Sequence, residues 1–294
     1  MGDMMKNTSA AYVGVDIGGT NTRIGLFDAL DSPLCRIIAK FPTQERYEEQ
    51  IERVVGAIMD IQNMQGIMVA GTGCSIGGQL ASDGRKLVVA PNLTTYVGRP
   101  FAQDIEHGCN CPVRLAHDAV CGLLAEKRFG DLRYFERCAY VTVSTGTGAA
   151  IQLAKGTVAL TSSLEIGHQI LNSNERVCLC GQVGCLETYT GGRQITLREG
   201  RSPAEITDPE FWETFCAKLA IGLVNLTMLT RVEVVALSGA IVLNKLPLLT
   251  QLQQRVNAIL CNAKLTLKLA VLGENAPLVG AAQLLAVSES TILH

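Results

Sequence analysis

Two glycine-rich turns, each lying between two apolar strand-like runs, constrain the fold of this chain more than any other feature. The first turn lies in A-Y-V-G-V-D-I-G-G-T-N-T-R-I-G-L-F, residues 11–27, and the second in A-Y-V-T-V-S-T-G-T-G-A-A-I-Q-L, residues 139–153. In both segments the runs on either side of the glycines have the composition of strands. A single turn of this kind is most often only a hairpin turn. Two matched turns in separate halves indicate a duplicated fold that holds one polyphosphate from two sides.

The composition of these turns predicts phosphate binding. A P-loop or a dinucleotide fingerprint needs a helix after its glycines, whereas this chain returns as a strand. Glycine lets the backbone approach an anion closely, and short polar side chains add donors. Asp16, at the end of the first strand, is placed to hold Mg²⁺ through water. The predicted phosphate contacts are Gly18, Gly19, Thr20 and Asn21 in the first turn and Thr145, Gly146, Thr147 and Gly148 in the second.

A cluster of metal-ligand residues follows the second turn. Three cysteines lie within eight residues, and a histidine lies ten residues before the first of them. Thiolate and imidazole groups bind zinc tetrahedrally, and a set of four leaves no position for water, so this zinc would be structural. The alternative is that some are ordinary buried cysteines. Glu165 and Glu187 lie just outside the set and would be held in place by the metal. The predicted ligands are His168, Cys178, Cys180 and Cys185.

Composition sets the outer limits. A length of 294 residues is sufficient for two domains with substantial cores. The net charge of −2 gives no reason to expect a nucleic acid or an acidic membrane surface as a partner. Of the 11 cysteines, those outside the cluster are scattered through apolar runs, unlike a secreted disulfide framework. Residues 1–10 are polar and have no apolar leader region. We expect a cytoplasmic protein with reduced thiols and no membrane-spanning segment.

The remaining periodicity predicts alternating helices and strands. Residues 47–64 form an amphipathic pattern, and a buried strand follows it at 66–75. The domain prediction is a small α/β domain over 10–118, completed by a C-terminal helix within 277–290, and a larger α/β domain over 119–276 that carries the zinc loop. The other predicted elements are strands at 112–116, 232–237 and 265–272 and helices at 119–128, 209–230, 246–260 and 277–287.

The motifs in their order resemble the ROK family of sugar kinases and repressors. D-I-G-G-T-N-T-R at 16–23 resembles the first phosphate motif of that family, and S-T-G-T-G at 144–148 resembles the second. A-P-N-L-T-T-Y-V-G-R-P at 90–100 is similar to a sugar-binding loop. E-I-G-H at 165–168 with C-L-C-G-Q-V-G-C-L-E at 178–187 resembles the zinc and sugar signature, which is the most specific of these motifs. L-S-G-A at 237–240 resembles the adenosine motif, with Gly239 at the nucleotide.

The resemblance implies a fold and further site residues. The fold would be the two-lobed actin-like ATPase fold, related to ribonuclease H, with duplicated domains and an active-site cleft between the lobes. Asp118 takes the place of the family's catalytic base, although a carboxylate there can also cap the following helix. His117 replaces the usual asparagine beside it. Asn92 could equally be a turn former after a proline. The implied sugar-binding residues are Gly78, Asn92, His117, Asp118, Glu165, His168 and Glu187.

The leading function implied by the resemblance is an ATP-dependent hexose kinase that phosphorylates the 6-hydroxyl of glucose or a related hexose. Its cofactors would be Mg²⁺ with ATP and one structural Zn²⁺, and its assembly a homodimer. N-acetylmannosamine, N-acetylglucosamine, allose and fructose are alternative substrates, and the specificity shell departs from the family pattern at His117, Gly77, Ser163–Leu164 and Ser238. A different class is a non-catalytic sugar sensor or repressor. We expect no DNA binding, because only about eleven residues precede residue 12, where the resemblance begins.

Overall fold

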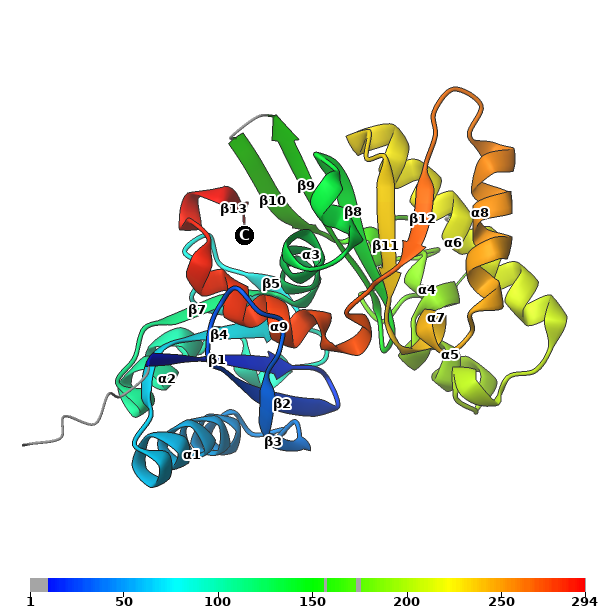
Figure 1. Cartoon of the computed structure of the whole chain (residues 1–294). Helices are drawn as coiled ribbons and strands as arrows, with labels where there is room; N and C mark the ends of the chain where they lie inside the picture. The colour runs from blue at the N-terminus through cyan, green and yellow to red at the C-terminus, as the bar shows by residue number, and fades with distance from the viewer. Residues whose placement is uncertain (1–9, 156–157, 173–175, 294) are drawn as a thin grey trace, which may run out of the picture. The chain divides into compact units, whose positions relative to one another are not determined.

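The computed structural model describes residues 10–155, 158–172 and 176–293 (Figure 1). The polar segment at residues 1–9 lies outside the described residues. Contacts between Cα atoms divide the chain into two compact units. The first unit contains residues up to 121 together with 277–289, and the second contains 122–276 together with 290–293. The chain therefore passes from the first unit to the second and back before its last strand joins the second.

The first unit contains a five-stranded mixed sheet in the order β3-β2-β1-β4-β7. β1 pairs antiparallel with β2 and parallel with β4, and β4 pairs parallel with β7. The carboxyl ends of β1, β4 and β7 therefore share one edge of this sheet, where Asp16, His117 and Asp118 lie. A small hairpin, β5 (Gln79–Leu80) with β6 (Leu87–Val89), lies outside it. The sheet strands are β1 (Ala10–Ile17), β2 (Asn21–Phe27), β3 (Arg36–Pro42), β4 (Met68–Ile76) and β7 (Val113–His117).

Helices cover this first sheet. α1 (Tyr47–Gln65) buries Val54 and Ile58 completely, as its apolar periodicity predicts, and α2 (Phe101–Cys109) buries Phe101. α9 (Ala276–Gln283) approaches the strands so closely that only glycine fits opposite it. A Cβ added at Gly14 would lie 2.6 Å from the carbonyl oxygen of Leu278. A Cβ at Gly73 would clash with the carbonyl of Ala281 in the same way.

The second unit repeats the strand order of the first. Its sheet runs β12-β11-β8-β9-β10-β13, so the order of the five strands from β8 to β12 matches that of β1, β2, β3, β4 and β7. β8 pairs antiparallel with β9 and parallel with β11, which also corresponds to the first unit. The structure thus has the duplicated arrangement predicted from the two glycine turns. The strands are β8 (Arg137–Val143), β9 (Thr147–Lys155), β10 (Val158–Leu164), β11 (Val234–Ser238), β12 (Thr266–Leu269) and β13 (Ile292–Leu293).

The helices of the second unit pack around the longest of them, α6 (Pro209–Thr230). Its start is determined locally, because Asp208 caps it by accepting the N–H of Glu210, and proline occupies its first position. α6 buries Phe215 and Leu219 in the core of this unit. Helix α3 (Asp118–Arg128) contains the boundary between the two units. The other helices are α4 (Glu187–Thr190), α5 (Gly192–Glu199), α7 (Ala240–Leu243) and α8 (Pro247–Ile259).

Candidate functional site

The first glycine turn joins β1 to β2 as an exposed hairpin. The N–H of Gly18 donates to the carbonyl of Asn21 at 3.0 Å, and residues 19–21 are exposed. A Cβ added at Gly19 would lie 3.4 Å from Cβ of Asn92, so the predicted sugar-binding asparagine lies against the predicted phosphate turn. The backbone of this turn is open to an anion, and its phosphate contacts stay a prediction.

A buried hydrogen-bond network holds this turn from behind. Gln50 on α1 is fully buried, and its Nε2 donates to Oγ1 of Thr22 at 2.8 Å, while its Oε1 accepts the N–H of Gln44 at 3.0 Å. Thr22 Oγ1 lies 3.0 Å from Oγ1 of Thr43, which donates to the carbonyl of Gly18 at 2.7 Å. Sequence patterns gave no signal for this network, because Gln50 is 28 residues from Thr22. It fixes the conformation of the turn.

Asp16 lies at the end of β1 and is 9% exposed. Its Oδ2 accepts a hydrogen bond from Nη2 of Arg23 at 2.7 Å, and its Oδ1 accepts one from Oγ of Ser75 at 2.9 Å. Burial raises the pKa of Asp16, and Arg23 and Ser75 oppose that rise, while the negative charge of Asp118 adds to it. Arg23 and Ser75 were not predicted as site residues. They occupy both carboxylate oxygens of the residue predicted to hold Mg²⁺ through water.

Asp118 and His117 lie where β7 passes into α3. The N–H of Ala119 donates to Oδ1 of Asp118 at 2.6 Å, so the carboxylate caps its own helix, and its side chain is 36% exposed. Nδ1 of His117 lies 3.0 Å from the same Oδ1. The helix-capping role and a role as a base are therefore compatible, since Oδ2 has no hydrogen-bond partner among the described residues. The base assignment stays a prediction.

Gly78, the other predicted sugar contact of the first unit, needs to be glycine. Its φ of 122° lies in the region that side chains avoid, and a Cβ there would lie 2.6 Å from the carbonyl oxygen of Val89. Within the first unit, Asp118 is therefore near enough to Asp16 for its charge to raise the pKa of Asp16, and Asn92 lies close to Gly19.

The second glycine turn, between β8 and β9, contacts a glutamate from the cysteine-rich segment. The N–H of Thr147 donates to Oε2 of Glu187 at 2.7 Å, and Oγ1 of Thr147 lies 2.7 Å from Oγ1 of Thr190. A Cβ added at Gly146 would lie 2.7 Å from the same carboxylate oxygen. The backbone N–H and the hydroxyl group of Thr147 therefore both have partners inside the protein. The predicted phosphate contacts at Thr145, Gly146, Thr147 and Gly148 stay predictions.

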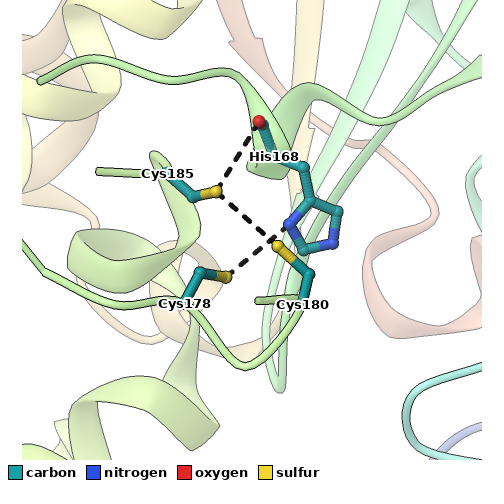
Figure 2. A group of neighbouring side chains, drawn as sticks. All are labelled: His168, Cys178, Cys180 and Cys185. Atoms are coloured by element: carbon teal, nitrogen blue, oxygen red, sulfur yellow. Dashed lines mark hydrogen bonds between the residues drawn. The ribbon is translucent and has the colours of Figure 1, made fainter. Parts of the chain in front are cut away.

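The four predicted zinc ligands converge (Figure 2). One ligand atom from each of His168, Cys178, Cys180 and Cys185 lies within 4.8 Å of the others. Sγ of Cys180 lies 3.8 Å from Sγ of Cys185, which equals the sulfur–sulfur separation of roughly 3.8 Å in a tetrahedral site with Zn–S bonds of about 2.3 Å. Burial raises the pKa of Cys178 and Cys185, and neighbouring thiols add to that rise for Cys185. The donor set and its spacing fit a closed zinc site.

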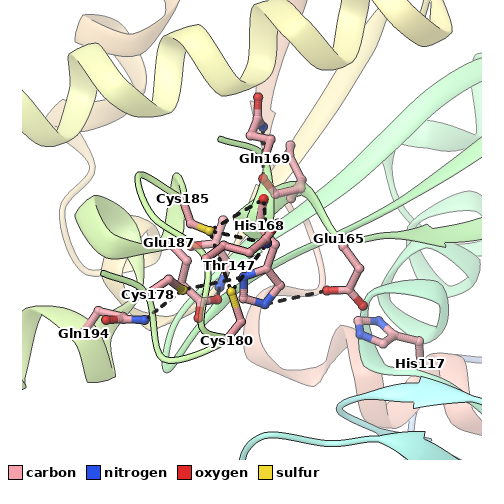
Figure 3. A network of polar contacts seen from close by, with 12 residues as sticks. His117, Thr147, Glu165, His168, Gln169, Cys178, Cys180, Cys185, Glu187 and Gln194 are labelled. Carbon is pink, nitrogen blue, oxygen red and sulfur yellow. Dashed lines mark hydrogen bonds and ion pairs between the residues drawn. The ribbon is translucent and has the colours of Figure 1, made fainter. Parts of the chain in front are cut away.

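Amide groups surround this cluster. Nε2 of Gln194, a buried residue on α5, donates to Sγ of Cys178 at 3.2 Å (Figure 3). Nε2 of Gln182 donates to Sγ of Cys180 at 3.5 Å. Nδ1 of His168 faces Sγ of Cys178 at 3.8 Å, while its Nε2 lies 3.9 Å from Oε2 of Glu165. One ring nitrogen is thus directed to the metal-ligand cluster and the other to a predicted sugar contact. Neither glutamine was predicted as a site residue, because only the folded structure shows that its side chain contacts a cysteine of the cluster.

A pocket of about 570 Å³ lies within the second unit beside the second glycine turn. Thr145, Trp212 and Ile241 contribute to its wall, and Nζ of Lys245 lies 4.1 Å from the centre of the Trp212 ring. Gly239 precedes the pocket residue Ala240 and has a φ of 89°. A Cβ added at Gly239 would lie 2.4–2.6 Å from backbone atoms of Val143. The apolar wall suits a planar base. Trp212 and Lys245 were not predicted, although Trp212 is the single tryptophan of the chain.

Comparison with known proteins identifies the family. The profile described as "ROK family" matches residues 12–287. The chain belongs to the ROK family. Within it, the chain is 26% identical over 194 residues to the glucokinase of Thermotoga maritima, an alignment that covers 64% of this chain and 60% of the relative. It is 28% identical over 194 residues to the N-acetyl-D-glucosamine kinase of Pectobacterium carotovorum, an alignment that covers 62% of this chain and 63% of the relative.

This ROK family chain also matches a regulator. It is 26% identical over 198 residues to the xylose repressor of Caldicellulosiruptor bescii, which covers 63% of this chain and 47% of the repressor. The alignments with these curated relatives span less than two thirds of their length. No helix in the described part of the chain is long and apolar enough to cross a membrane.

Solved structures of ROK proteins have the same fold. The ROK family glucokinase from Streptomyces griseus, in complex with glucose and AMPPNP, matches with a TM-score of 0.76 at 23% identity, over 94% of this chain and 99% of that one. The ROK hexokinase from Thermus thermophilus matches with a TM-score of 0.73 at 26% identity, over 92% and 96%. These matches confirm the predicted α/β fold of the actin-like ATPase type.

Proposed function

We propose that this protein is an ATP-dependent sugar kinase that transfers the γ-phosphoryl group to the 6-hydroxyl of glucose or a related hexose. The observation that carries the proposal is the carboxylate of Asp118, which has one oxygen held by the N–H of Ala119 and the other without a partner among the described residues. Such a group can accept the hydroxyl proton as the sugar attacks. The relatives named glucokinase and N-acetyl-D-glucosamine kinase support the same reaction class.

Phosphoryl transfer depends mainly on positioning and on charge stabilisation. In the proposed mechanism the two glycine turns bind the phosphates through backbone N–H groups, and Asp16 orients the water shell of Mg²⁺. The nucleotide base occupies the pocket beside Trp212 and Ile241. The sugar is bound by the backbone of Gly78 and by the side chains that the sequence predicts as sugar contacts. These side chains are Asn92, His117, Glu165, His168 and Glu187.

The zinc assigned to His168, Cys178, Cys180 and Cys185 would be structural. When bound, the metal supplies positive charge that keeps the thiolates ionised and cross-links the loop. The chain's own residues do the rest. The cluster orients the His168 ring so that Nε2 faces Glu165, and it anchors the segment that leads into Glu187. The zinc site thereby positions two proposed sugar contacts.

A substrate panel tests the proposal. Glucose, mannose, allose, fructose, N-acetylglucosamine and N-acetylmannosamine should be compared at equal concentration in a coupled assay of ADP release. The proposal expects sugar-dependent ADP formation with at least one of them, and mass spectrometry should then show a 6-phosphate. N-acetylhexosamines are included because a relative carries the name N-acetyl-D-glucosamine kinase. A zinc-loaded protein that turns over none of these sugars would contradict the assignment.

A sugar-responsive regulator is the second candidate, because xylose repressors are among the relatives. A regulator needs to bind a sugar but not to transfer phosphate. The two candidates differ in one readout: calorimetric binding of a sugar, with no ADP release in the presence of MgATP, would favour the regulator. We also propose a homodimer, which analytical ultracentrifugation would check directly.

A further inference from the structure

We infer that Tyr96 is a positioning residue through which sugar binding and nucleotide binding affect each other within the first unit. Its hydroxyl group binds residues 43–45, a segment between β3 and α1 that also holds the first glycine turn. We call residues 43–45 the connector. The inference rests on the proposed kinase function, and it adds to that function a coupling between the two substrates.

The connector holds the glycine turn through its first residue. The backbone N–H of Thr43 donates to the carbonyl of Thr20 at 3.0 Å, and its Oγ1 donates to the carbonyl of Gly18 at 2.7 Å. Residues 19–21 are exposed, so solvent surrounds the part of the turn that would bind phosphate. The two bonds from Thr43 therefore restrain this exposed turn from its protein side.

The second connector residue contacts the predicted sugar loop, residues 90–100. The carbonyl of Gln44 accepts the hydroxyl group of Tyr96 at 2.6 Å, and its N–H donates to Oε1 of Gln50 at 3.0 Å. Asn92, a proposed sugar contact four residues before Tyr96, lies against the turn at Gly19. The sugar loop therefore contacts the glycine turn directly at Asn92 and through the connector at Tyr96.

Tyr96 anchors a loop that is otherwise mostly exposed. Among residues 91–100, all but Leu93 and Tyr96 are exposed, and Tyr96 is 1% exposed. The ring of Tyr96 packs against the rings of Tyr47 and Phe101, with centroids 5.6 and 6.2 Å away. Since Leu93 has no polar side-chain group, the hydroxyl group of Tyr96 is the buried side-chain donor of this loop. The packed ring determines where that hydroxyl group lies, and the hydroxyl group holds the connector.

This arrangement lets the two ligands share the cost of ordering the backbone. Exposed segments lose conformational entropy when a ligand fixes them. Because the connector is bonded to the sugar loop and to the glycine turn, a sugar that orders the loop also restrains the turn. A nucleotide that then binds the turn loses less freedom, so the sugar raises the nucleotide affinity. By linkage, the nucleotide raises the sugar affinity by the same factor.

Calorimetry measures this coupling without turnover, from the Kd of MgADP with and without saturating glucose. In the wild type, glucose should lower this Kd by at least about fivefold, the lower end of the usual range for coupled sites. Tyr96→Phe keeps the ring and removes the hydroxyl group, so glucose should lower the Kd by less than about twofold. Tyr47→Phe is the matched control, because the hydroxyl group of Tyr47 belongs to the same aromatic cluster but donates to Asp104 on α2 at 2.6 Å. It should keep the wild-type factor. A wild-type factor near one, or a wild-type factor kept in Tyr96→Phe, overturns the inference.

Amide hydrogen exchange tests the same link in the ligand-free protein. In Tyr96→Phe, the amides of residues 18–21 and of Thr43 should exchange at least about threefold faster than in the wild type, as expected for the loss of one hydrogen bond. In Tyr47→Phe they should exchange at the wild-type rate. Equal exchange rates in the two variants overturn the inference. If the wild type phosphorylates no sugar, the proposed function fails, and the exchange rates still decide whether Tyr96 holds the glycine turn.

Discussion

Oε2 of Glu187 accepts the backbone N–H of Thr147 at 2.7 Å, so a residue two positions after the last cysteine of the metal-ligand cluster holds the second glycine turn. A proposed sugar contact and a proposed phosphate turn thus share one hydrogen bond. Glycines at 146, 167 and 191 leave room for this carboxylate, since a Cβ at any of them would lie within 2.5–3.1 Å of a Glu187 side-chain atom.

The first prediction concerns this bond. Glu187→Gln keeps an acceptor for Thr147 but loses the charge, and a hydrogen bond to a charged group is worth about 1 kcal/mol more than a neutral one. We expect the KM values for ATP and for the sugar to rise together, each by roughly fivefold. Steady-state kinetics with either substrate varied would measure this. Glu199→Gln, which affects a partly exposed ion pair with Arg198, is the matched control. A rise in only one KM would show that Glu187 serves one substrate alone.

The second prediction concerns the proposed base. Asp118→Asn removes the proton acceptor and keeps the shape, so turnover should fall by roughly two to four orders of magnitude. Sugar affinity measured by calorimetry should change much less. Turnover within tenfold of the wild type would remove Asp118 from this role.

The third prediction concerns the metal and the amide beside it. Cys180→Ser should lower the zinc content from about one per chain and raise the sugar KM. Gln194→Leu removes the N–H donor to Cys178 and should weaken zinc retention by about 10–100-fold, as loss of a supporting hydrogen bond typically does. Competition with a chelator, followed by elemental analysis, measures both. Cys261→Ser changes an exposed cysteine of the same unit and should leave zinc retention at the wild-type level. Wild-type protein purified without chelator and lacking zinc would contradict this prediction.

The fourth prediction concerns the network behind the first glycine turn. Gln50→Leu leaves Thr22 and the N–H of Gln44 without their buried partner, a loss of about 1–3 kcal/mol. The KM for ATP should rise by about tenfold, because the turn that binds phosphate is no longer fixed. Gln62→Leu on the same helix removes a bond to the carbonyl of Cys109 and serves as the control. Equal KM values for ATP in the two variants would show that Gln50 does not contribute to nucleotide binding.

The fifth prediction concerns pH. Burial raises the pKa of Glu126 on α3, against the lowering effect of the N–H of Leu272. Since the folded-state pKa lies above the unfolded one, the folded protein binds more protons, and this contribution to stability is lost as pH rises from about 4.3 through the raised value. Glu126→Gln cannot ionise. Its melting temperature relative to the wild type should therefore increase with pH across that window, and a constant difference would refute the assignment.

Sequence reasoning predicted the features whose signals are local. The helix at 209–230 has the predicted bounds, because the aspartate cap and the proline at its start act on neighbouring residues. The convergence of the four residues predicted to bind zinc has the same reason, since most of them are close in sequence. By contrast, the exposed edge strand β3 has no regular burial pattern and was missed. The final helix, predicted at 277–287, ends at residue 283 and continues as a short 3₁₀ turn.

Contacts across long sequence separations could not be predicted. Gln194 reaches Cys178, and Gln50 reaches Thr22, only after the chain has folded, and glutamine alone carries no signal for either role. The orientation of His117 toward Asp118 is a similar case. The sequence showed a departure from the family pattern, but the direction of the ring depends on how β7 enters α3.

The late position of α9 in the chain determines when the first unit can be completed on the ribosome. Its strands are synthesised first, yet α9 (Ala276–Gln283), the helix that lies against Gly14 and Gly73, follows almost all of the second unit in the chain. Domains generally fold as units in the order of their synthesis. Here the unit that begins first is completed only after residues 122–276 of the second unit have been made. A premature stop codon just before residue 277 would therefore damage the amino-terminal unit, although every one of its strands had already been translated.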